Sequence, residues 1–220
     1  MMDRLRERQL VPEILDTLAP DDPAAVRSYR DLARINCLMG NHRFFLRTLR
    51  RHAQAGPWLE IGSGDGRLGQ VLRRNLPAPD FSLTGFDLKP RGKFFPRDWS
   101  WQAGNLLEDL WPTSRHHMAN LILHHFTDPE LRSLRPRFQS ARMLVFSEPA
   151  RRRRHLWQML LFRLLRPDPV TIHDADASIR AGFLPGELPS LLGLNTPEWT
   201  LTESLHPMGA CRLVAVREEA

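Results

Sequence analysis

The sequence predicts an α/β protein with a doubly wound, mostly parallel sheet. Short apolar segments with strand character alternate with segments whose apolar residues recur at helical spacing. One of these strands runs directly into a glycine-rich turn and a helix, over residues 57–70. The chain has 220 residues, enough for one domain with a sizeable core. Alternation of this kind favours parallel strands with helices on both faces of the sheet.

The first part of the chain is expected to be helical. Apolar residues recur near helical spacing over residues 3–18, although Pro12 interrupts them. Asp22 can cap a second helix that Gly40 should end, and a third helix begins near Asn41. We therefore expect a helical cap that precedes the first strand.

The rest of the chain supplies the sheet. We divide the protein into a helical cap, 1–55, and a second part, 56–220, which together form one structural unit. Two final strands should form a hairpin at the sheet edge. The expected strands lie at 58–61, 81–86, 100–103, 117–124, 143–146, 199–205 and 212–217. The expected helices after the first strand begin near 67, 128, 150 and 185, with Asp128 as the cap of the second.

The composition is that of a globular domain, and the sequence gives no sign of a membrane span or a signal peptide. Hydrophobic residues make up 42% and charged residues 25% of the chain, as in ordinary globular domains. No apolar run is long enough to span a bilayer, and the charged first residues lack the apolar core of a signal peptide. Cys37 and Cys211 form no metal or redox motif and fit a reducing cytoplasm.

The net charge of +6 leaves a nucleic-acid partner open. However, the sequence holds no basic-aromatic motif and no appended RNA-binding module. We therefore favour solvated arginines on helix faces and expect no nucleic-acid partner.

The turn after the first strand is the most informative motif. Its pattern is Glu60-x-Gly62-x-Gly64-x-Gly66. A dinucleotide fingerprint would place its third glycine at position 67, which is arginine here. Glycine lets the backbone adopt positive φ and approach a ligand closely. The spacing thus favours a ligand cradle that does not serve a pyrophosphate, and the alternative is a tight strand-to-helix turn.

This pattern resembles motif I of class I S-adenosylmethionine (SAM)-dependent methyltransferases. The resemblance implies a Rossmann-like, seven-stranded sheet with a C-terminal antiparallel hairpin. It also implies SAM as methyl donor and S-adenosylhomocysteine (SAH) as product. The cofactor contacts that we expect are Glu60, Gly62, Ser63, Gly64, Asp65, Gly66, Asp87, Leu88, Asn105, Leu106 and Leu123.

Two of these positions follow the second and third strands. Asp87 can accept both ribose hydroxyls, as carboxylates at this place do in dinucleotide folds; a turn-forming aspartate is the alternative. Asn105 stands where the methyltransferase pattern usually has an aspartate that contacts adenine. Its side-chain oxygen can still accept a hydrogen bond, although it could equally be a loop asparagine.

The candidate catalytic residues lie further along the chain. The run Leu123-His124-His125-Phe126 resembles the fourth-strand motif of small-molecule methyltransferases, including those that methylate quinone precursors. It lacks the Asn/Asp-Pro-Pro-Tyr/Phe run of enzymes that methylate amino groups of bases. A neutral His124 could accept a proton from a hydroxyl nucleophile, or it could be structural.

A polar stretch, 171–180, is expected to be a loop near the site, similar to a serine-isoleucine segment of quinone-type methyltransferases. His173 and Asp174 could orient a substrate or act as a base there. A solvated turn in which Asp174 or Asp176 caps a helix is an equal alternative.

The helix near 150–165 begins with four arginines and continues with apolar residues that include Trp157 and Leu164. It could rest on an anionic membrane surface or guard a hydrophobic substrate. We favour packing of its apolar side against the sheet.

We therefore predict a SAM-dependent methyltransferase (EC 2.1.1.-) that methylates oxygen or carbon of a phenol, a quinone-like compound or another hydrophobic metabolite. We expect no metal. The alternatives are an RNA or protein methyltransferase that uses its arginine-rich surface, and a SAM-binding protein without transferase activity. The sequence does not indicate an oligomeric state.

Overall fold

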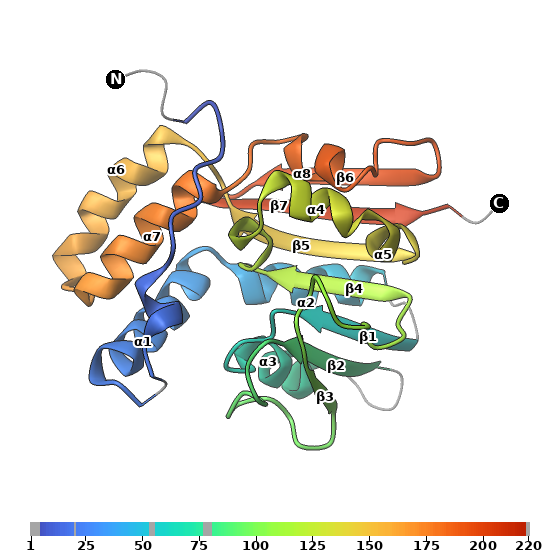
Figure 1. Ribbon diagram of the computed structural model, residues 1–220, viewed down its shortest axis with the longest axis horizontal. Helices are drawn as coiled ribbons and strands as arrows, with labels where there is room; N and C mark the ends of the chain where they lie inside the picture. The colour runs from blue at the N-terminus through green and yellow to red at the C-terminus, as the bar shows by residue number, and fades with distance from the viewer. Residues whose placement is uncertain (1–4, 20, 53–55, 77–80, 219–220) are drawn as a thin grey trace.

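A computed structural model describes residues 5–19, 21–52, 56–76 and 81–218. It contains a seven-stranded sheet in the order β3-β2-β1-β4-β5-β7-β6 (Figure 1). The first five strands are parallel, and β7 pairs antiparallel with both β5 and β6. The predicted α/β fold with a C-terminal hairpin at the edge is confirmed.

The strands are β1 (Gly56–Ile61), β2 (Phe81–Asp87), β3 (Ser100–Ala103), β4 (His116–Asn120), β5 (Met143–Pro149), β6 (Trp199–Leu205) and β7 (Ala210–Arg217). The α-helices are α1 (Pro23–Leu38), α2 (Asn41–Arg51), α3 (Arg67–Asn75), α4 (Asp128–Ser133), α5 (Arg135–Gln139), α6 (Arg153–Phe162), α7 (Pro169–Ala181) and α8 (Glu187–Leu191). Three 3₁₀ helices are η1 (Ile14–Thr17), η2 (Leu123–His125) and η3 (Arg163–Leu165).

Two apolar cores lie on opposite faces of the sheet because side chains alternate along each strand. Leu144 and Phe146 of β5 face a core that α4, α5 and α8 cover. Met143 and Val145 face the other core, which α2 and α3 cover. The helices therefore lie on both faces, as a doubly wound sheet requires.

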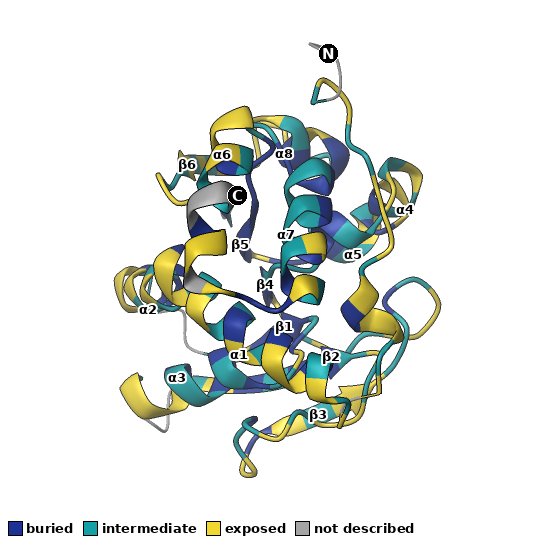
Figure 2. Cartoon of the chain, turned by 90° about the vertical axis from the view of Figure 1, so that its left-hand side faces the viewer, coloured by how far each residue is buried: buried dark blue, intermediate teal, exposed yellow. Residues whose placement is uncertain are grey.

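Helices α1, α6 and α7 occupy a third position, beyond the carboxyl ends of the parallel strands (Figure 1). Figure 2 looks onto this end of the molecule and shows these helices in front of the strands. Helix α7 contacts α1, α6 and η1. Ligands of open α/β sheets bind at this edge, so these helices border the region where a site is expected.

The prediction of a helix over residues 3–18 is wrong for the described part, because only Ile14–Thr17 is helical. The backbone instead bonds to other elements: Gln9 N donates to Arg180 O at 3.1 Å, and Ile14 N donates to Asp174 Oδ1 at 2.8 Å. Pro12 cannot donate to a helix, and these partners satisfy the extended segment. We call residues 5–17 the N-terminal strap. Asp22 and Pro23 do begin α1, and Gly40 ends it, as predicted.

The fourth strand is shorter than predicted and ends at Asn120. Leu121 has a φ of 57°, so the chain turns there, and Leu123–His125 forms η2. The predicted loop over 171–180 is also wrong, because these residues lie within α7. Asp168 caps that helix through Val170 N, whereas Asp174 and Asp176 lie inside it.

Two smaller corrections concern helix ends and packing. Thr127, not Asp128, caps α4, in a reciprocal pair with Glu130. In the helical region after β5, Trp157 is 69% exposed and Leu164 is 78% exposed, so these two side chains do not pack against the sheet as predicted. No helix within the described residues is long and apolar enough to cross a membrane.

Candidate functional site

The turn between β1 and α3 is built from three left-handed glycines, Gly62, Gly64 and Gly66. A Cβ on Gly62 would lie 2.4 Å from Ile122 Cγ1, and one on Gly66 would lie 2.3 Å from Phe95 N. A Cβ on Gly64 would meet nothing within 4 Å. Packing thus explains the outer two glycines, whereas Gly64 faces open space where a ligand could approach the backbone.

Asp87 ties the end of β2 to this turn. Its Oδ2 accepts from Gly64 N at 2.8 Å, and its Oδ1 accepts from Lys89 N at 2.9 Å. Each carboxylate oxygen can accept a further bond, so Asp87 can still receive two hydroxyls. Leu88 follows it with 73% of its surface exposed, which offers an apolar face beside those oxygens.

The buried end of β1 holds Glu60, which is 2% exposed. Its Oε2 has no hydrogen-bond partner, while Ser63 Oγ donates to its backbone carbonyl at 2.9 Å. Burial raises the pKa of the Glu60 carboxyl to about 8, and the nearby carboxylates of Asp87 and Asp65 add to the rise. A cation placed next to this carboxyl would favour its ionised form and give Oε2 a partner.

Four other predicted cofactor residues have partners or close neighbours within the protein. Asp65 accepts from Arg67 Nε at 2.7 Å. Asn105 Oδ1 accepts from Leu107 N at 2.9 Å, so it closes its own turn, as the alternative for this residue describes. Leu106 and Leu123 are buried in the core under α4 and α5.

A second polar group lies at the carboxyl ends of β4 and β5. Glu148 is fully buried and accepts from the backbone N–H groups of Ile122, Leu123 and His124. Its Oε2 also accepts from His124 Nδ1 at 2.8 Å. These four bonds hold η2 in place and fix the direction of the His124 ring.

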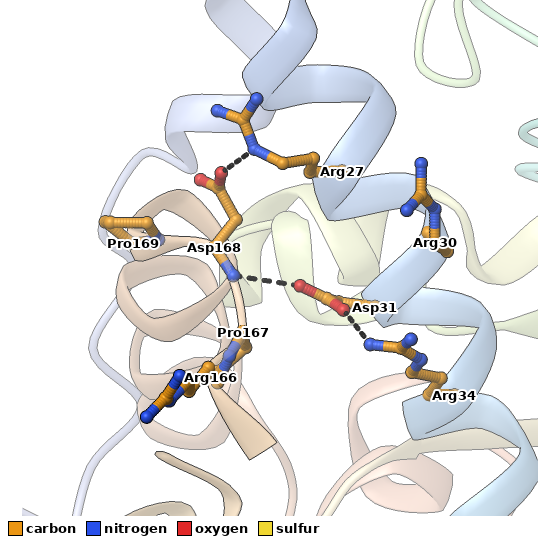
Figure 3. A pocket seen from close by; sticks show the side chains of 8 residues that line it. All are labelled: Arg27, Arg30, Asp31, Arg34, Arg166, Pro167, Asp168 and Pro169. Atoms are coloured by element: carbon orange, nitrogen blue, oxygen red, sulfur yellow. Dashed lines mark hydrogen bonds and ion pairs between the residues drawn. The ribbon is translucent and has the colours of Figure 1, made fainter. Parts of the chain in front are cut away.

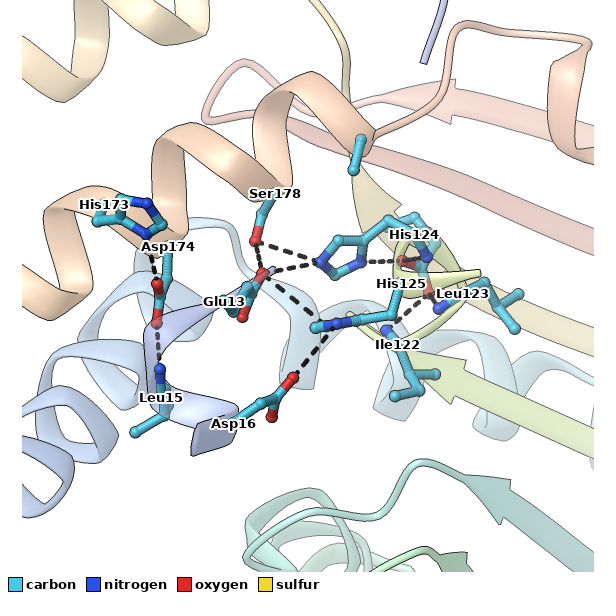
Figure 4. A network of polar contacts seen from close by, with 12 residues as sticks. Glu13, Leu15, Asp16, Ile122, Leu123, His124, His125, His173, Asp174 and Ser178 are labelled. Atoms are coloured by element: carbon cyan, nitrogen blue, oxygen red, sulfur yellow. Dashed lines mark hydrogen bonds and ion pairs between the residues drawn. The ribbon is translucent and has the colours of Figure 1, made fainter. Parts of the chain in front are cut away.

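The other side of the His124 ring faces the N-terminal strap and α7 (Figure 4). His124 Nε2 lies 3.2 Å from Ser178 Oγ and 3.5 Å from Glu13 Oε1. Ser178 Oγ donates to the same Glu13 oxygen. His125 Nε2 lies 3.9 Å from Glu13 Oε1, and its Nδ1 lies 3.7 Å from Asp16 Oδ2.

Burial and charged neighbours together set the pKa values of His124 and Glu13. Burial alone would lower the pKa of His124, but hydrogen bonds and charges of Glu13 and Glu148 outweigh it and raise the pKa to about 9. Burial would raise the pKa of Glu13, but His124 and His125 bring it down to about 2. A histidine that holds its proton at neutral pH is poorly suited to accept another, which argues against His124 as a free base.

His173 and Asp174 do not join this group directly. His173 Nδ1 lies 2.9 Å from Asp174 Oδ1, and the His173 side chain is 43% exposed. Asp174 is buried and accepts from Ile14 N and Leu15 N at 2.8 and 3.0 Å. The pair therefore anchors η1 to α7, one turn before Ser178, and its catalytic role stays a prediction.

Arg8 fastens the strap over this end of the sheet. Its guanidinium donates to Asp128 Oδ1 and to the carbonyls of His124, Phe126 and Ala181, at 2.7 to 3.1 Å. It also lies 4.3 Å from the centre of the Phe183 ring. The strap thus bonds to η2, α4 and α7 at once.

Arg8→Ala is expected to lower the free energy of unfolding by about 2–3 kcal/mol, because buried carbonyls and a carboxylate lose charge-assisted bonds. Urea denaturation measures the change. Replacing the exposed Arg132 with alanine serves as the control and should leave the midpoint nearly unchanged. Equal midpoints for the two variants would contradict the assigned role of Arg8.

A cavity of about 380 Å³ lies between α1 and the start of α7 (Figure 3). Arg27 Nε donates to Asp168 Oδ2 at 2.7 Å, and Arg34 Nη1 donates to Asp31 Oδ1 at 2.9 Å. Asp31 Oδ2 accepts from Asp168 N at 2.9 Å. None of the predicted site residues lines this cavity, and the two aspartates in it tie α1 to α7.

Three carboxylates of the second polar group, Glu13, Asp16 and Glu148, are not among the site residues that the sequence predicts. Glu13 and Asp16 lie in the segment predicted to be a helix, 3–18, and Glu148 lies two residues beyond the strand expected at 143–146. The strand-end position of Glu148 was the available signal, since polar residues there face the ligand edge. Nothing local in the sequence connects Glu13 with His124.

Comparisons with known proteins agree with this architecture. No protein-family model matches the sequence, and no curated protein matches it. Among solved structures, human N-acetylserotonin methyltransferase in complex with SAM is similar, with a TM-score of 0.63 and 17% identity over 99% of this chain. The plantazolicin methyltransferase BpumL in complex with SAH gives a TM-score of 0.67 at 10% identity, with 90% of this chain and 92% of that chain covered.

The pyocyanin biosynthetic protein PhzM is also similar, with a TM-score of 0.58 and 16% identity over 94% of this chain. The chain spans 65% of the N-acetylserotonin methyltransferase and 62% of PhzM, slightly less than two thirds of each. At these identities the likeness concerns the fold. The strand order, the hairpin and these matches agree: the chain has the fold of class I SAM-dependent methyltransferases.

Proposed function

We propose that this protein is a SAM-dependent methyltransferase that acts on a small hydroxyl-bearing or phenol-like acceptor. The observation that carries the proposal is the cradle at the end of β1. Gly64 faces open space there, beside the unpartnered Oε2 of buried Glu60. A ligand that carries a cationic group and a hydroxylated ring would fill the space beside Gly64 and give this oxygen of Glu60 a partner.

The residues of the cradle fit SAM in charge and shape. Glu60 would hold the ammonium group, because a buried carboxylate gains most from a cation that it can contact. Asp87 would accept the ribose hydroxyls with its free lone pairs, and Leu88 would cover one face of the adenine. Asn105 and Leu106 would border the base.

When bound, SAM supplies an electrophilic methyl group on its sulfonium. The chain's own contribution is to align an acceptor with that group and to exclude water, which accounts for much of the catalysis in reactions of this kind. The strap, α1 and α7 lie beyond the carboxyl ends of the parallel strands, where the acceptor would bind. Lys89 directly follows Asp87 and Leu88, and its Nζ lies 3.7 Å from Asp16 Oδ1 of the strap. The strap therefore also lies near residues that would hold SAM. His124 stays a predicted catalytic residue at these strand ends.

A small molecule is the acceptor that the surroundings favour. The strap lies over the polar group of Glu13 and His124, and both side chains are at most 13% exposed. A bulky nucleic acid or folded protein would meet the strap first. The similar structures include enzymes named for N-acetylserotonin and for plantazolicin. Cys37 and Cys211 are free thiols, in keeping with a proposed cytoplasmic location.

The test begins with calorimetric titration of the purified protein with SAM and with SAH. Saturable binding of both is expected, and a screen of phenols and quinone-like acceptors for SAH formation follows. Binding without turnover of any acceptor would favour a SAM-binding protein without transferase activity. Failure of the folded protein to bind either ligand would overturn the proposal.

A further inference from the structure

The second polar group contains three side chains whose donor atoms converge. One ligand atom each from Glu13, His124 and His125 lies within 4.8 Å of the other two. The two histidines are neighbours in η2, with ring centres 4.3 Å apart. Glu13 comes from the N-terminal strap and faces both rings (Figure 4). Two imidazoles and one carboxylate are a common set of ligands for a divalent transition metal.

The outer nitrogens of both rings face further carboxylates. His124 Nδ1 lies 2.8 Å from Glu148 Oε2, and His125 Nδ1 lies 3.7 Å from Asp16 Oδ2. Histidines that bind metals almost always place their second nitrogen against a carboxylate or a carbonyl, which fixes the ring orientation. Here His125 Nε2 faces Glu13, and His124 Nε2 faces both Glu13 and the hydroxyl of Ser178, which lies 3.2 Å away.

The distances between the proposed ligand atoms are close to those in a site that holds a metal ion. Bonds of about 2.1 Å in a tetrahedral site place neighbouring ligand atoms about 3.4 Å apart. Glu13 Oε1 lies 3.5 Å from His124 Nε2 and 3.9 Å from His125 Nε2. His125 is 28% exposed, so its ring can shift and a cation can enter from solvent.

In contrast to the expectation of no metal from the sequence, we propose that Glu13, His124 and His125 bind a divalent first-row metal ion, with Zn²⁺ as the ion that their ligand set suits well. Glu13 and Glu148 flank His124 on both sides, and Asp16 already pairs with Lys89, so the ion would take the place of the proton that His124 holds between the two glutamates. Three protein ligands leave at least one position open. Since Glu13 belongs to the strap, the ion would also fasten the strap to η2.

An open position at this place has a chemical consequence, which rests on the proposed function. A hydroxyl oxygen that binds the ion loses its proton to solvent more readily than a free hydroxyl does. The ion would therefore select acceptors that carry a hydroxyl group. It would supply the activation that His124, held between two carboxylates, is poorly suited to give as a base.

The experiment uses untagged protein stripped with EDTA and dialysed, in the absence of SAM. ZnCl₂ is titrated by calorimetry at pH 8, and CoCl₂ is titrated while visible absorption is recorded. We expect the protein to bind one equivalent of Zn²⁺ or one equivalent of Co²⁺. The bound Co²⁺ should show the visible absorption bands of a site with nitrogen and oxygen ligands. Glu13→Gln and His125→Ala should each weaken binding by more than about 100-fold, because even loss of an outer carboxylate costs 10–100-fold.

His52→Ala is the control, since His52 is a partly buried histidine that follows α2, on the face of the sheet opposite to the core that holds Leu123 of η2. It should bind both ions as the wild type does, and circular dichroism checks that all variants are folded. Wild-type protein that binds neither ion, or binding that survives either Glu13→Gln or His125→Ala, would overturn the proposed site. SAM titration of the same stripped protein tests the cofactor site separately, so the two proposals can fail independently.

Discussion

Gly64→Arg is expected to abolish binding of SAM and SAH while leaving the protein folded. The position has a φ of +53° and open space around its Cβ, so an arginine side chain would extend into the proposed cradle. We expect affinity to fall at least 100-fold, equivalent to about 2.8 kcal/mol. The left-handed backbone should cost about 1–2 kcal/mol of stability. Calorimetry measures the affinity and thermal unfolding measures the stability.

Gly186→Arg provides the matched control for this variant. Gly186 precedes α8, has a φ of +83° and also has nothing within 4 Å of its Cβ position. Its substitution should cause a similar loss of stability without any change in SAM affinity. If the two variants bind SAM equally well, the glycine turn is not the cofactor cradle.

Glu60→Gln should have opposite effects on stability and on cofactor binding. The pKa of Glu60 is raised from 4.5 to about 8, mainly by burial. In the ligand-free protein, the folded state thus binds a proton that the unfolded state has released between these two values. Stability that this group contributes is complete below pH 4.5 and is lost as the pH rises toward 8. Glutamine has no proton to lose, so the variant should escape that loss.

The size of the effect follows from the shift. A rise of about 3.5 units corresponds to at most about 5 kcal/mol at pH 8, at 1.36 kcal/mol per unit, and water penetration will reduce it. We expect Glu60→Gln to be more stable than the wild type at pH 8 by a few kcal/mol and nearly equal to it at pH 4.5. Its affinity for SAM should fall at least tenfold, because the ammonium loses its carboxylate.

Urea denaturation across pH 4.5–8.5, without ligand, measures the difference in stability. Glu108→Gln, which changes an exposed carboxyl, is the control and should leave the pH profile unchanged. A Glu60→Gln profile that runs parallel to the wild-type profile would show that Glu60 is ionised in the ligand-free protein. An unchanged SAM affinity would separate Glu60 from the cofactor site.

The sheet and the glycine turn could be predicted because their signals are local. A buried strand, a residue that must adopt positive φ and a helix that follows are each encoded within a few neighbouring residues. Hence β1, β2, β3 and the hairpin lie where they were expected. The prediction failed where tertiary bonds replaced local ones. The amides of Ile122 and Leu123 donate to Glu148 instead of extending β4, and the strap donates to Asp174 and Arg180 instead of forming a helix.

The sequence by itself therefore determined the fold class and the residues proposed to hold the cofactor. Only the tertiary structure determined which residues form the second polar group, at the carboxyl ends of β4 and β5. It brings Glu13 from the start of the chain to His124 after β4 and to Ser178 in α7, and it leaves His173 and Asp174 as anchors of the strap. The physical reason is that these contacts join segments far apart in sequence, and no spacing or periodicity within a segment records which distant carboxylate will meet a given histidine.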